Sequence, residues 1–155
     1  MNIEYKENKI DKKILHSFLI ESDSEFDPVL SLRINLSDYA QKMIDNAKLF
    51  EAYMNGKLVA LVAVYANDYI KKSAYITYVY CKKEYRCLGI SNMLFIRIFS
   101  YLKQNSFQTV SLEVSSKNIP AVNLYKKFGF EYVDVLKNNP QRIIMSAFLN
   151  NTDSF

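Results

Sequence analysis

The sequence predicts a mixed α/β fold in which about four helices flank a central, mostly antiparallel sheet of about six to seven strands. Segments with helical periodicity alternate with β-rich runs, and the run SAYITYVYC (73–81) is β-branched and aromatic throughout. An Asn55-Gly56 pair also separates two apolar runs, as in a hairpin. With 155 residues, of which 50% are hydrophobic, the chain is expected to form one domain over 1–155, with a frayed tail at 150–155.

The first part of the chain is expected to hold two helices separated by a loop. Residues 11–20 carry one apolar stripe, and Asp11 is the expected N-cap. This stripe consists of Ile14, Leu15, Phe18 and Leu19. A second helix is expected to begin at Ser37 as its cap. Its inner face would be formed by Tyr39, Ala40, Met43, Ile44 and Ala47. Between the helices, the acidic segment 21–30 shows no period, which predicts a solvated loop.

The rest of the chain is expected to be mainly strands. Asn55-Gly56 favours a type I′ turn between two strands, because both residues tolerate positive φ. The expected strands are 50–54, 57–66, 73–81, 109–114, 130–136 and 141–149, the last two forming a closing hairpin. A long helix is expected to begin near Leu88. Its inward side chains would be Ile90, Met93, Leu94, Ile98, Phe99 and Leu102.

Composition argues against several classes of function. No stretch approaches the roughly 20 apolar residues of a membrane span, and the N-terminal segment lacks an apolar signal core, so a cytoplasmic chain without a membrane span is expected. Cys81 and Cys87 have neither a redox nor a metal-ligand spacing, and His16 is the only histidine. A metal site and a Ser/His/Asp triad are therefore not expected. The net charge of +4 comes with scattered lysines, which suits a small phosphate-bearing ligand better than nucleic acid.

The segment KKEYRCLGIS (82–91) connects a strand to the long helix and is the first candidate binding site. The unpaired N–H groups at a helix start form an anion site, and a diphosphate is a natural guest. Gly89 would let the backbone approach a ligand closely, and Arg86 with Lys82 and Lys83 would add positive charge. A glycine in the first turn of an ordinary helix would give the same pattern.

A second motif follows in SKNIPAVNLYKKFGF (116–130), which predicts a short helix with Asn118 as its cap, Pro120 in its first turn and Gly129 as its left-handed C-cap. The 85–91 loop, the strand TVSLEV and this helix, in that order, resemble the GNAT superfamily of acyl-CoA-dependent N-acetyltransferases. The resemblance covers about residues 74–135. It implies a GNAT-like fold with a splayed central sheet.

The resemblance also implies the site residues for acetyl-CoA, the expected cosubstrate. The family's Arg/Gln-x-x-Gly-x-Gly/Ala loop, which holds the CoA pyrophosphate, maps onto Arg86, Cys87, Leu88, Gly89, Ile90 and Ser91. Ser91 replaces the usual Gly or Ala, and Cys87 and Leu88 stand where Gly and a basic residue are common. Asn118 matches an asparagine that contacts the pantetheine arm, and Tyr125 a tyrosine near the thioester sulfur. Backbone N–H groups of Val79, Tyr80 and Cys81 would stabilise the developing oxyanion.

Two side chains are candidates for proton transfer. Tyr125 would protonate the leaving thiolate, with the alternative that its hydroxyl merely reaches solvent from the inner face of its helix. Glu113 is the candidate base on the strand beside the splay, although it could also simply face solvent. Asp68 and Glu84 are weaker candidates, and a chain of water molecules to bulk is a further alternative.

The resemblance implies an enzyme that transfers acetyl from acetyl-CoA to a primary amine. A small-molecule acceptor, such as an amino-sugar, is expected, and a protein N-terminus or lysine is the alternative. A non-catalytic module that binds acyl-CoA and regulates a partner is a hypothesis from another class. No nucleic-acid partner is expected, and the chain would be a monomer or homodimer.

Overall fold

The computed structural model describes residues 2–149 of the chain. Its strands are β1 (Ile3–Glu7), β2 (Lys48–Met54), β3 (Lys57–Asp68), β4 (Ser73–Cys81), β5 (Thr109–Ser115), β6 (Glu131–Leu136) and β7 (Asn139–Phe148). Its α-helices are α1 (Lys12–Ser22), α2 (Leu36–Asn46), α3 (Ile90–Gln104) and α4 (Ile119–Lys127). Three short 3₁₀ helices, η1 (Asp23–Glu25), η2 (Leu30–Leu32) and η3 (Lys83–Tyr85), lie in the connections.

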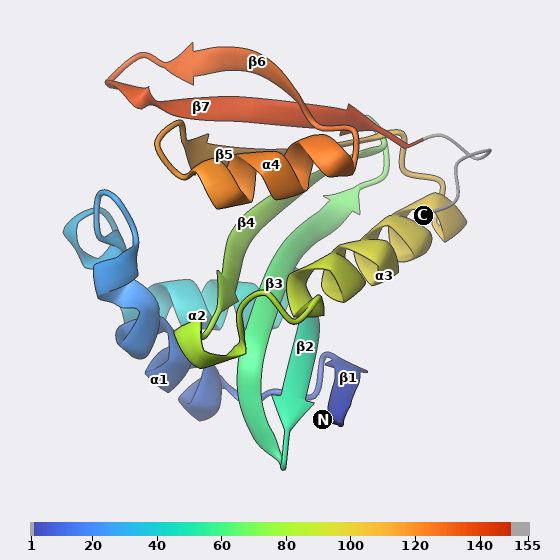
Figure 1. Ribbon diagram of the computed structural model, residues 1–155. Coiled ribbons are helices and arrows are strands. Elements are labelled where there is room, and N and C mark those ends of the chain that lie inside the picture. Colours follow the sequence, from blue (N-terminus) through green and yellow to red (C-terminus); the bar gives the residue numbers. More distant parts are fainter. Residues whose placement is uncertain (1, 150–155) are drawn as a thin grey trace. The chain divides into compact units, whose positions relative to one another are not determined.

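The strands form one seven-stranded sheet in the order β1-β2-β3-β4-β5-β7-β6 (Figure 1). Neighbours pair antiparallel in β1/β2, β2/β3, β5/β7 and β6/β7, whereas β4 and β5 pair parallel. The parallel register is short, joining Ser73–Ile76 to Thr109–Leu112. The mixed fold with a mostly antiparallel sheet, predicted from the sequence, is confirmed.

Two compact units, each discontinuous in sequence, divide the chain. Unit 1 contains the residues up to Val64 together with Tyr78–Leu94, and unit 2 contains Tyr65–Thr77 and the described residues from Phe95 onward. The chain crosses between them within β3, β4 and α3. The prediction of one domain over 1–155 stays a prediction.

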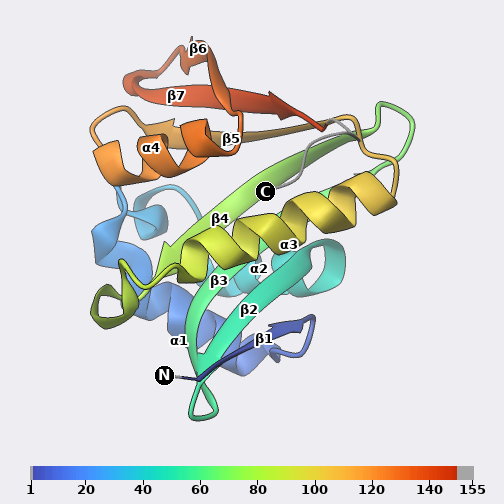
Figure 2. The same ribbon diagram turned by 45° about the vertical axis from the view of Figure 1, so that its right-hand side comes forward.

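In unit 1, α1 and α2 cover one face of β2 and β3 (Figure 2). Asp11 caps α1 as predicted, because its side chain accepts from the Ile14 N–H at 2.9 Å. Leu15, Phe18 and Leu19 are buried, but Ile14 is 50% exposed, so the predicted stripe is wrong at this position. The prediction of Ser37 as the second cap is also wrong. The N-cap of α2 is Asn35, whose side-chain oxygen accepts a hydrogen bond from the Asp38 N–H in the first turn.

A buried carboxylate fixes the N-terminal strand of unit 1, which the sequence analysis did not predict. Glu51 in β2 is fully buried, and it accepts hydrogen bonds from the Lys9 and Ile10 N–H groups at 3.0 and 3.2 Å. The Tyr53 hydroxyl donates to it at 2.7 Å. Buried charge is tolerated where hydrogen bonds satisfy it in this way. The segment that joins β1 to α1 is therefore anchored on β2.

The predicted turns of unit 1 and unit 2 are confirmed at two glycines. Asn55 and Gly56 both have positive φ, 52° and 76°, as a type I′ turn requires. Gly129 follows the C-cap Phe128 of α4 with φ 88°, and the Phe130 N–H donates back to the Tyr125 carbonyl at 3.0 Å. This closure is the left-handed C-cap that the sequence predicts.

The core of unit 2 is a cluster of aromatic rings. Phe95 and Phe99 of α3 pack against Phe128 and Phe130 with centroid separations between 5.5 and 6.4 Å. Phe95 is fully buried although the predicted inward face of the long helix omits it. Met93, which lies on the unit 1 part of α3 and was predicted to point inward, is 38% exposed.

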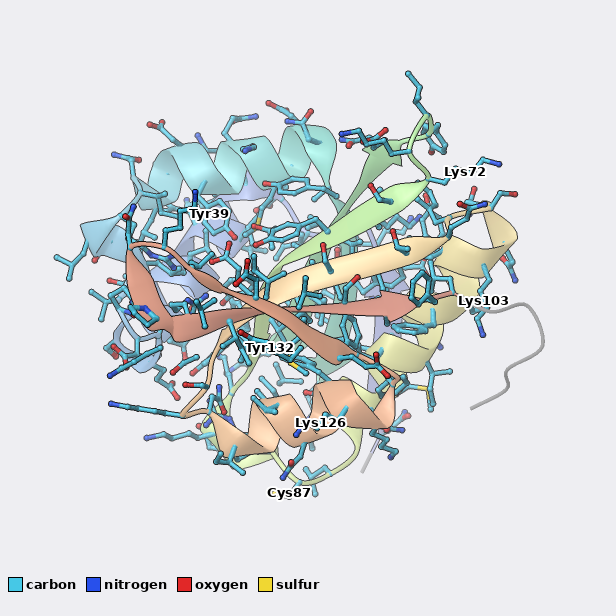
Figure 3. The ribbon with its side chains drawn as sticks, turned by 90° about the horizontal axis from the view of Figure 1, so that it is seen from above. Tyr39, Lys72, Cys87, Lys103, Lys126 and Tyr132 are labelled. Atoms are coloured by element: carbon cyan, nitrogen blue, oxygen red, sulfur yellow. The ribbon has the colours of Figure 1, made fainter. Side chains whose placement is uncertain are left out.

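The edge strand β6 is exposed over most of its length, and Tyr132 on it is 59% exposed (Figure 3).

Candidate cofactor-binding and catalytic residues

The predicted phosphate loop lies in unit 1 between β4 and α3. After η3, Cys87 and Gly89 both have left-handed backbone conformations, with φ 63° and 81°. The first helical hydrogen bond runs from the Met93 N–H to the Gly89 carbonyl at 3.0 Å. The N–H groups of Ile90 and Ser91 therefore have no acceptor within the helix, and the helix dipole adds partial positive charge beside them. This backbone geometry is suited to an anion.

The structure gives Gly89 a reason that the sequence analysis did not name, its left-handed backbone conformation. A Cβ placed there would meet no atom of the described chain within 4 Å, so no protein neighbour requires a glycine. The positive φ requires it, because residues with a Cβ adopt this conformation at a cost. The close approach of a ligand to the Gly89 backbone stays a prediction.

The Arg86 side chain is held by three contacts within unit 1. Its Nε donates to the Cys81 carbonyl at 2.8 Å, its Nη2 donates to Glu25 at 2.8 Å, and its guanidinium lies 5.5 Å from the centroid of the Tyr80 ring. The Tyr80 hydroxyl donates to the other oxygen of Glu25. Burial raises the pKa of Tyr80, and its contact with the Glu25 carboxylate raises it further, so the phenol keeps its proton.

Glu25 corrects the prediction that the acidic segment 21–30 is merely solvated. Slight burial raises the pKa of Glu25, but hydrogen bonds from Tyr80 and Arg86 outweigh this and hold it below its usual value. A neighbouring acid, Glu21, pairs with Lys82 at 3.4 Å, and the Lys82 ammonium lies 5.9 Å from the Phe18 ring centroid. Two of the acidic side chains of this segment are therefore paired with the phosphate loop and the residues that precede it.

The three residues expected to supply oxyanion donors end β4 in unit 1. Tyr80 and Cys81 are buried, and Val79 between Tyr78 and Tyr80 is partly exposed. Arg86 occupies the Cys81 carbonyl, and the next N–H, that of Lys82, donates to the Val59 carbonyl at 2.9 Å. Burial raises the pKa of the Cys81 thiol to about 11, which makes it a poor nucleophile. Cys87 is exposed (Figure 3).

In unit 2, Glu113 belongs to a polar group that joins three strands. It accepts from the Tyr75 hydroxyl of β4 at 2.8 Å, and its other oxygen lies 3.9 Å from the Arg142 guanidinium of β7. Arg142 is only 13% exposed. Glu113 therefore does not simply face solvent, since two side chains of unit 2 engage it. Asp68, a weaker candidate base, accepts from the Lys71 N–H at 3.0 Å in the turn after β3.

Tyr125 is buried in the aromatic core of unit 2. It is 5% exposed, and its ring lies 5.6 Å from Phe95 and 5.8 Å from Phe130 between centroids. The alternative that its hydroxyl merely reaches solvent stays a prediction. Burial raises the pKa of Tyr125, while the positive charge of Arg142 opposes this shift. Arg142 thus acts electrostatically on both candidate proton-transfer residues, Tyr125 and Glu113.

The structure thus gathers the predicted residues into groups inside each unit. The residues from Val79 to Ser91 surround the start of α3 in unit 1, while Glu113 and Tyr125 share Arg142 in unit 2. Asn118, also in unit 2, caps α4 by accepting from the Ala121 N–H at 3.3 Å. The sequence analysis missed Glu25, Tyr75 and Arg142. For Tyr75, the signal was strand alternation, because it faces away from its buried neighbours Ala74 and Ile76.

Within residues 2–149, no three His, Cys, Asp or Glu side chains come together as a metal ion would require. No helix in that part of the chain has the length and apolar character needed to cross a membrane.

Comparison with known proteins gives consistent matches. A model described as the acetyltransferase (GNAT) family matches residues 14–130. The chain is 35% identical over 94 residues to a probable N-acetyltransferase san of Drosophila melanogaster, covering 59% of this chain and 51% of that protein. It is 34% identical over 74 residues to N-alpha-acetyltransferase 50 of Danio rerio, covering 47% of this chain and 44% of that protein. The chain thus spans about half the length of these curated relatives.

A solved structure supports the fold. The PaiA N-acetyltransferase of Thermoplasma acidophilum, determined in complex with coenzyme A, matches with a TM-score of 0.70 at 16% identity, covering 96% of this chain and 99% of that chain. At this level of identity the similarity establishes the fold.

Proposed function

Since the family model covers residues 14–130, the chain belongs to the GNAT acetyltransferase family, and we propose that it transfers the acetyl group of acetyl-CoA to a primary amine. The observation that carries this proposal is the start of α3, where two left-handed residues precede backbone N–H groups that have no acceptor in the helix. Such a start holds a diphosphate well, because oriented N–H groups and the helix dipole act on the same anion.

The residues of the loop fit a CoA pyrophosphate. We assign its binding to the backbone of residues 86–91, with Asn118 contacting the pantetheine arm. Gly89 has no protein neighbour within 4 Å of an added Cβ, which leaves room for a ligand at the helix start. Acetyl-CoA supplies an activated acetyl thioester when bound. The remaining chemistry belongs to the side chains and backbone of this chain.

Three further roles complete the proposal. Glu113 accepts the proton of the attacking amine, and Tyr125 holds the proton needed by the departing thiolate. N–H groups within Val79–Cys81 donate to the carbonyl oxygen as it gains charge. Burial raises the pKa of Tyr125, which alone would make it a weaker acid. The same apolar surroundings would also raise the pKa of a thiol beside it, so the difference that governs the proton transfer changes less.

For the acceptor, we propose the α-amino group of a polypeptide. The support is the similarity to N-alpha-acetyltransferase 50, at 34% identity over 74 residues. The small-molecule amine expected from the sequence, including an amino-sugar, is the competing acceptor. Thiol release from acetyl-CoA, measured with peptides carrying free or blocked N-termini, amino-sugars, amino acids and polyamines, separates these classes. Turnover with free but not blocked peptides supports the proposal, and turnover with amino-sugars alone contradicts the acceptor assignment.

The cofactor assignment is tested at Gly89. Asp and Asn are nearly isosteric and both tolerate positive φ, so Gly89→Asp and Gly89→Asn differ mainly in charge. We expect Gly89→Asp to weaken CoA binding, measured by calorimetry, by more than about 10-fold relative to Gly89→Asn, because it places an anion against the diphosphate. Equal affinities in the two folded variants would remove the pyrophosphate from this helix start.

A further inference from the structure

We propose that Glu25 is a positioning residue for acetyl-CoA binding, because it holds Arg86 in a fixed orientation at the start of the phosphate loop. The inference rests on the proposed function, since it concerns the same loop. Glu25 lies in η1, in a different segment of unit 1, and is 61 residues away from Arg86 in the sequence. The sequence alone therefore gives no indication of the pair.

Two contacts fix the Arg86 guanidinium and leave part of it accessible. Arginine has five N–H donors in one plane, and here Nε and Nη2 donate to the Cys81 carbonyl and to Glu25, both at 2.8 Å. Two directed hydrogen bonds on one rigid fork determine its orientation. The Arg86 side chain is nevertheless 43% exposed, so further donors can face a ligand. A guanidinium already held in place loses less conformational entropy on binding an anion.

Glu25 is itself held by a buried strand. One carboxylate oxygen accepts from Arg86, and the other accepts from the hydroxyl of Tyr80, which is 8% exposed. Phe18 and Phe26 pack on the Tyr80 ring, at centroid separations of 5.6 and 6.2 Å. The position of Arg86 is thus tied to β4 through Glu25 and Tyr80, in addition to its direct bond to Cys81.

Electrostatic repulsion alone predicts the opposite change in CoA affinity when Glu25 is neutralised. The direction of that change therefore tests the proposal. A carboxylate near an anion site repels the ligand, so its neutralisation should strengthen CoA binding. If Glu25 instead acts by orienting Arg86, its neutralisation should weaken CoA binding. Glu21 provides the matched control. It is an acid of the same segment, but it pairs with Lys82 at 3.4 Å, whereas Arg86 pairs with Glu25.

The experiment measures CoA affinity by calorimetry for the wild type, Glu25→Gln and Glu21→Gln, with melting curves to verify folding. We expect Glu25→Gln to weaken binding by about 3- to 10-fold, corresponding to the loss of roughly one net hydrogen bond. Glu21→Gln should leave affinity within about two-fold or strengthen it slightly. Adenosine 3′-phosphate 5′-diphosphate is the nucleotide part of CoA without pantetheine, and we expect its binding to weaken in Glu25→Gln by the same factor as the binding of CoA. With an acceptor from the screen, KM for acetyl-CoA should rise while kcat stays unchanged.

A second variant tests whether Glu25 acts through Arg86. Arg86→Lys keeps the charge but loses the fork, so its effect and that of Glu25→Gln should be non-additive when combined. Additive effects would overturn the inference, as would a folded Glu25→Gln variant that binds CoA as tightly as the wild type or more tightly. If Glu25→Gln does not fold, the cycle is carried out with Tyr80→Phe, which removes the other contact of the carboxylate. A wild type that does not bind CoA would overturn the proposed function, and this inference with it.

Discussion

The same three kinds of side chain meet in each unit, but in different environments. In unit 1, Glu25 lies between Tyr80 and Arg86, and in unit 2, Glu113 lies between Tyr75 and Arg142. The first ion pair is a 2.8 Å hydrogen bond to an arginine that is 43% exposed. The second is 3.9 Å long, beyond hydrogen-bond length, and its arginine is 13% exposed.

This difference indicates different tasks for the two groups. A short, directed bond to an exposed guanidinium fixes geometry at a surface where a charged ligand can bind. A longer contact to a buried guanidinium fixes less geometry, but its charge acts strongly on its surroundings because less water screens it. Arg142 also lowers the pKa of Tyr125 against the effect of burial. We therefore expect variants of Glu25 to change cofactor binding and variants of Glu113 and Tyr125 to change turnover.

The largest change in turnover is expected for a variant of Tyr125. Tyr125→Phe keeps the ring packing on Phe95 and Phe130 and removes only the hydroxyl, so we expect kcat to fall by roughly 10- to 1,000-fold. CoA affinity should stay within a few fold, and the melting temperature should hardly move. Tyr132→Phe, on the exposed strand β6, is the control and should behave as the wild type. Parental turnover in Tyr125→Phe would remove this hydroxyl from the chemistry and contradict the difference in task between the two polar groups.

The next effect is expected at Glu113. Glu113→Gln removes the proton acceptor while its neighbours Tyr75 and Arg142 remain, so we expect turnover to fall by about 10-fold or more. The acidic limb of the pH–rate profile should flatten, because the protonation that limits the rate at low pH no longer occurs. Glu131→Gln on β6 serves as the exposed control. An unchanged acidic limb would assign the base to water or to another residue.

The smallest expected effect is the pH-dependent contribution of Glu25 to the stability of the protein. The folded-state pKa of Glu25 lies below its usual value of 4.5, so the unfolded chain binds the proton more readily near that pH. Its contribution to stability is therefore present above about pH 4.5 and is lost as the pH falls through the folded-state pKa. Glu25→Gln should melt a few degrees below the wild type at neutral pH, with the gap closing in acid. A gap that persists undiminished down to pH values where carboxyl groups are protonated would show that charge at Glu25 contributes no stability.

The sequence predicted most reliably the features that neighbouring residues determine. β4 has the predicted bounds, and Asn118 and Gly129 cap α4 as expected, because a cap depends on side chains within a few positions. The second helix cap failed by two residues, since Asn35 and Ser37 both have suitable side chains and only the backbone conformation selects between them. Tyr125 was identified through a family motif, yet its burial depends on rings from α3.

Contacts between segments that are distant in the sequence could not be predicted. Glu25 and Arg86 are 61 residues apart, and Tyr75 and Glu113 are 38 apart. Neither pair produces a local pattern, because each depends on which strands and loops become neighbours. β1 was missed for a related reason. It is a five-residue strand whose partner, β2, begins about forty positions later. Its link to α1 is fixed by Glu51 through hydrogen bonds between residues 42 and 41 positions apart.

The buried Glu51 carboxylate makes the beginning of this chain intolerant to trimming. A deletion that removed Lys9 and Ile10 would take away two of the N–H donors that satisfy Glu51 and leave only the Tyr53 hydroxyl among its recorded partners. An ionised group buried without adequate partners strongly destabilises the folded state. Ile10 also belongs to the hydrophobic core of this unit, so a shortened form without it would lose a donor to the buried Glu51 carboxylate and a core side chain at the same step.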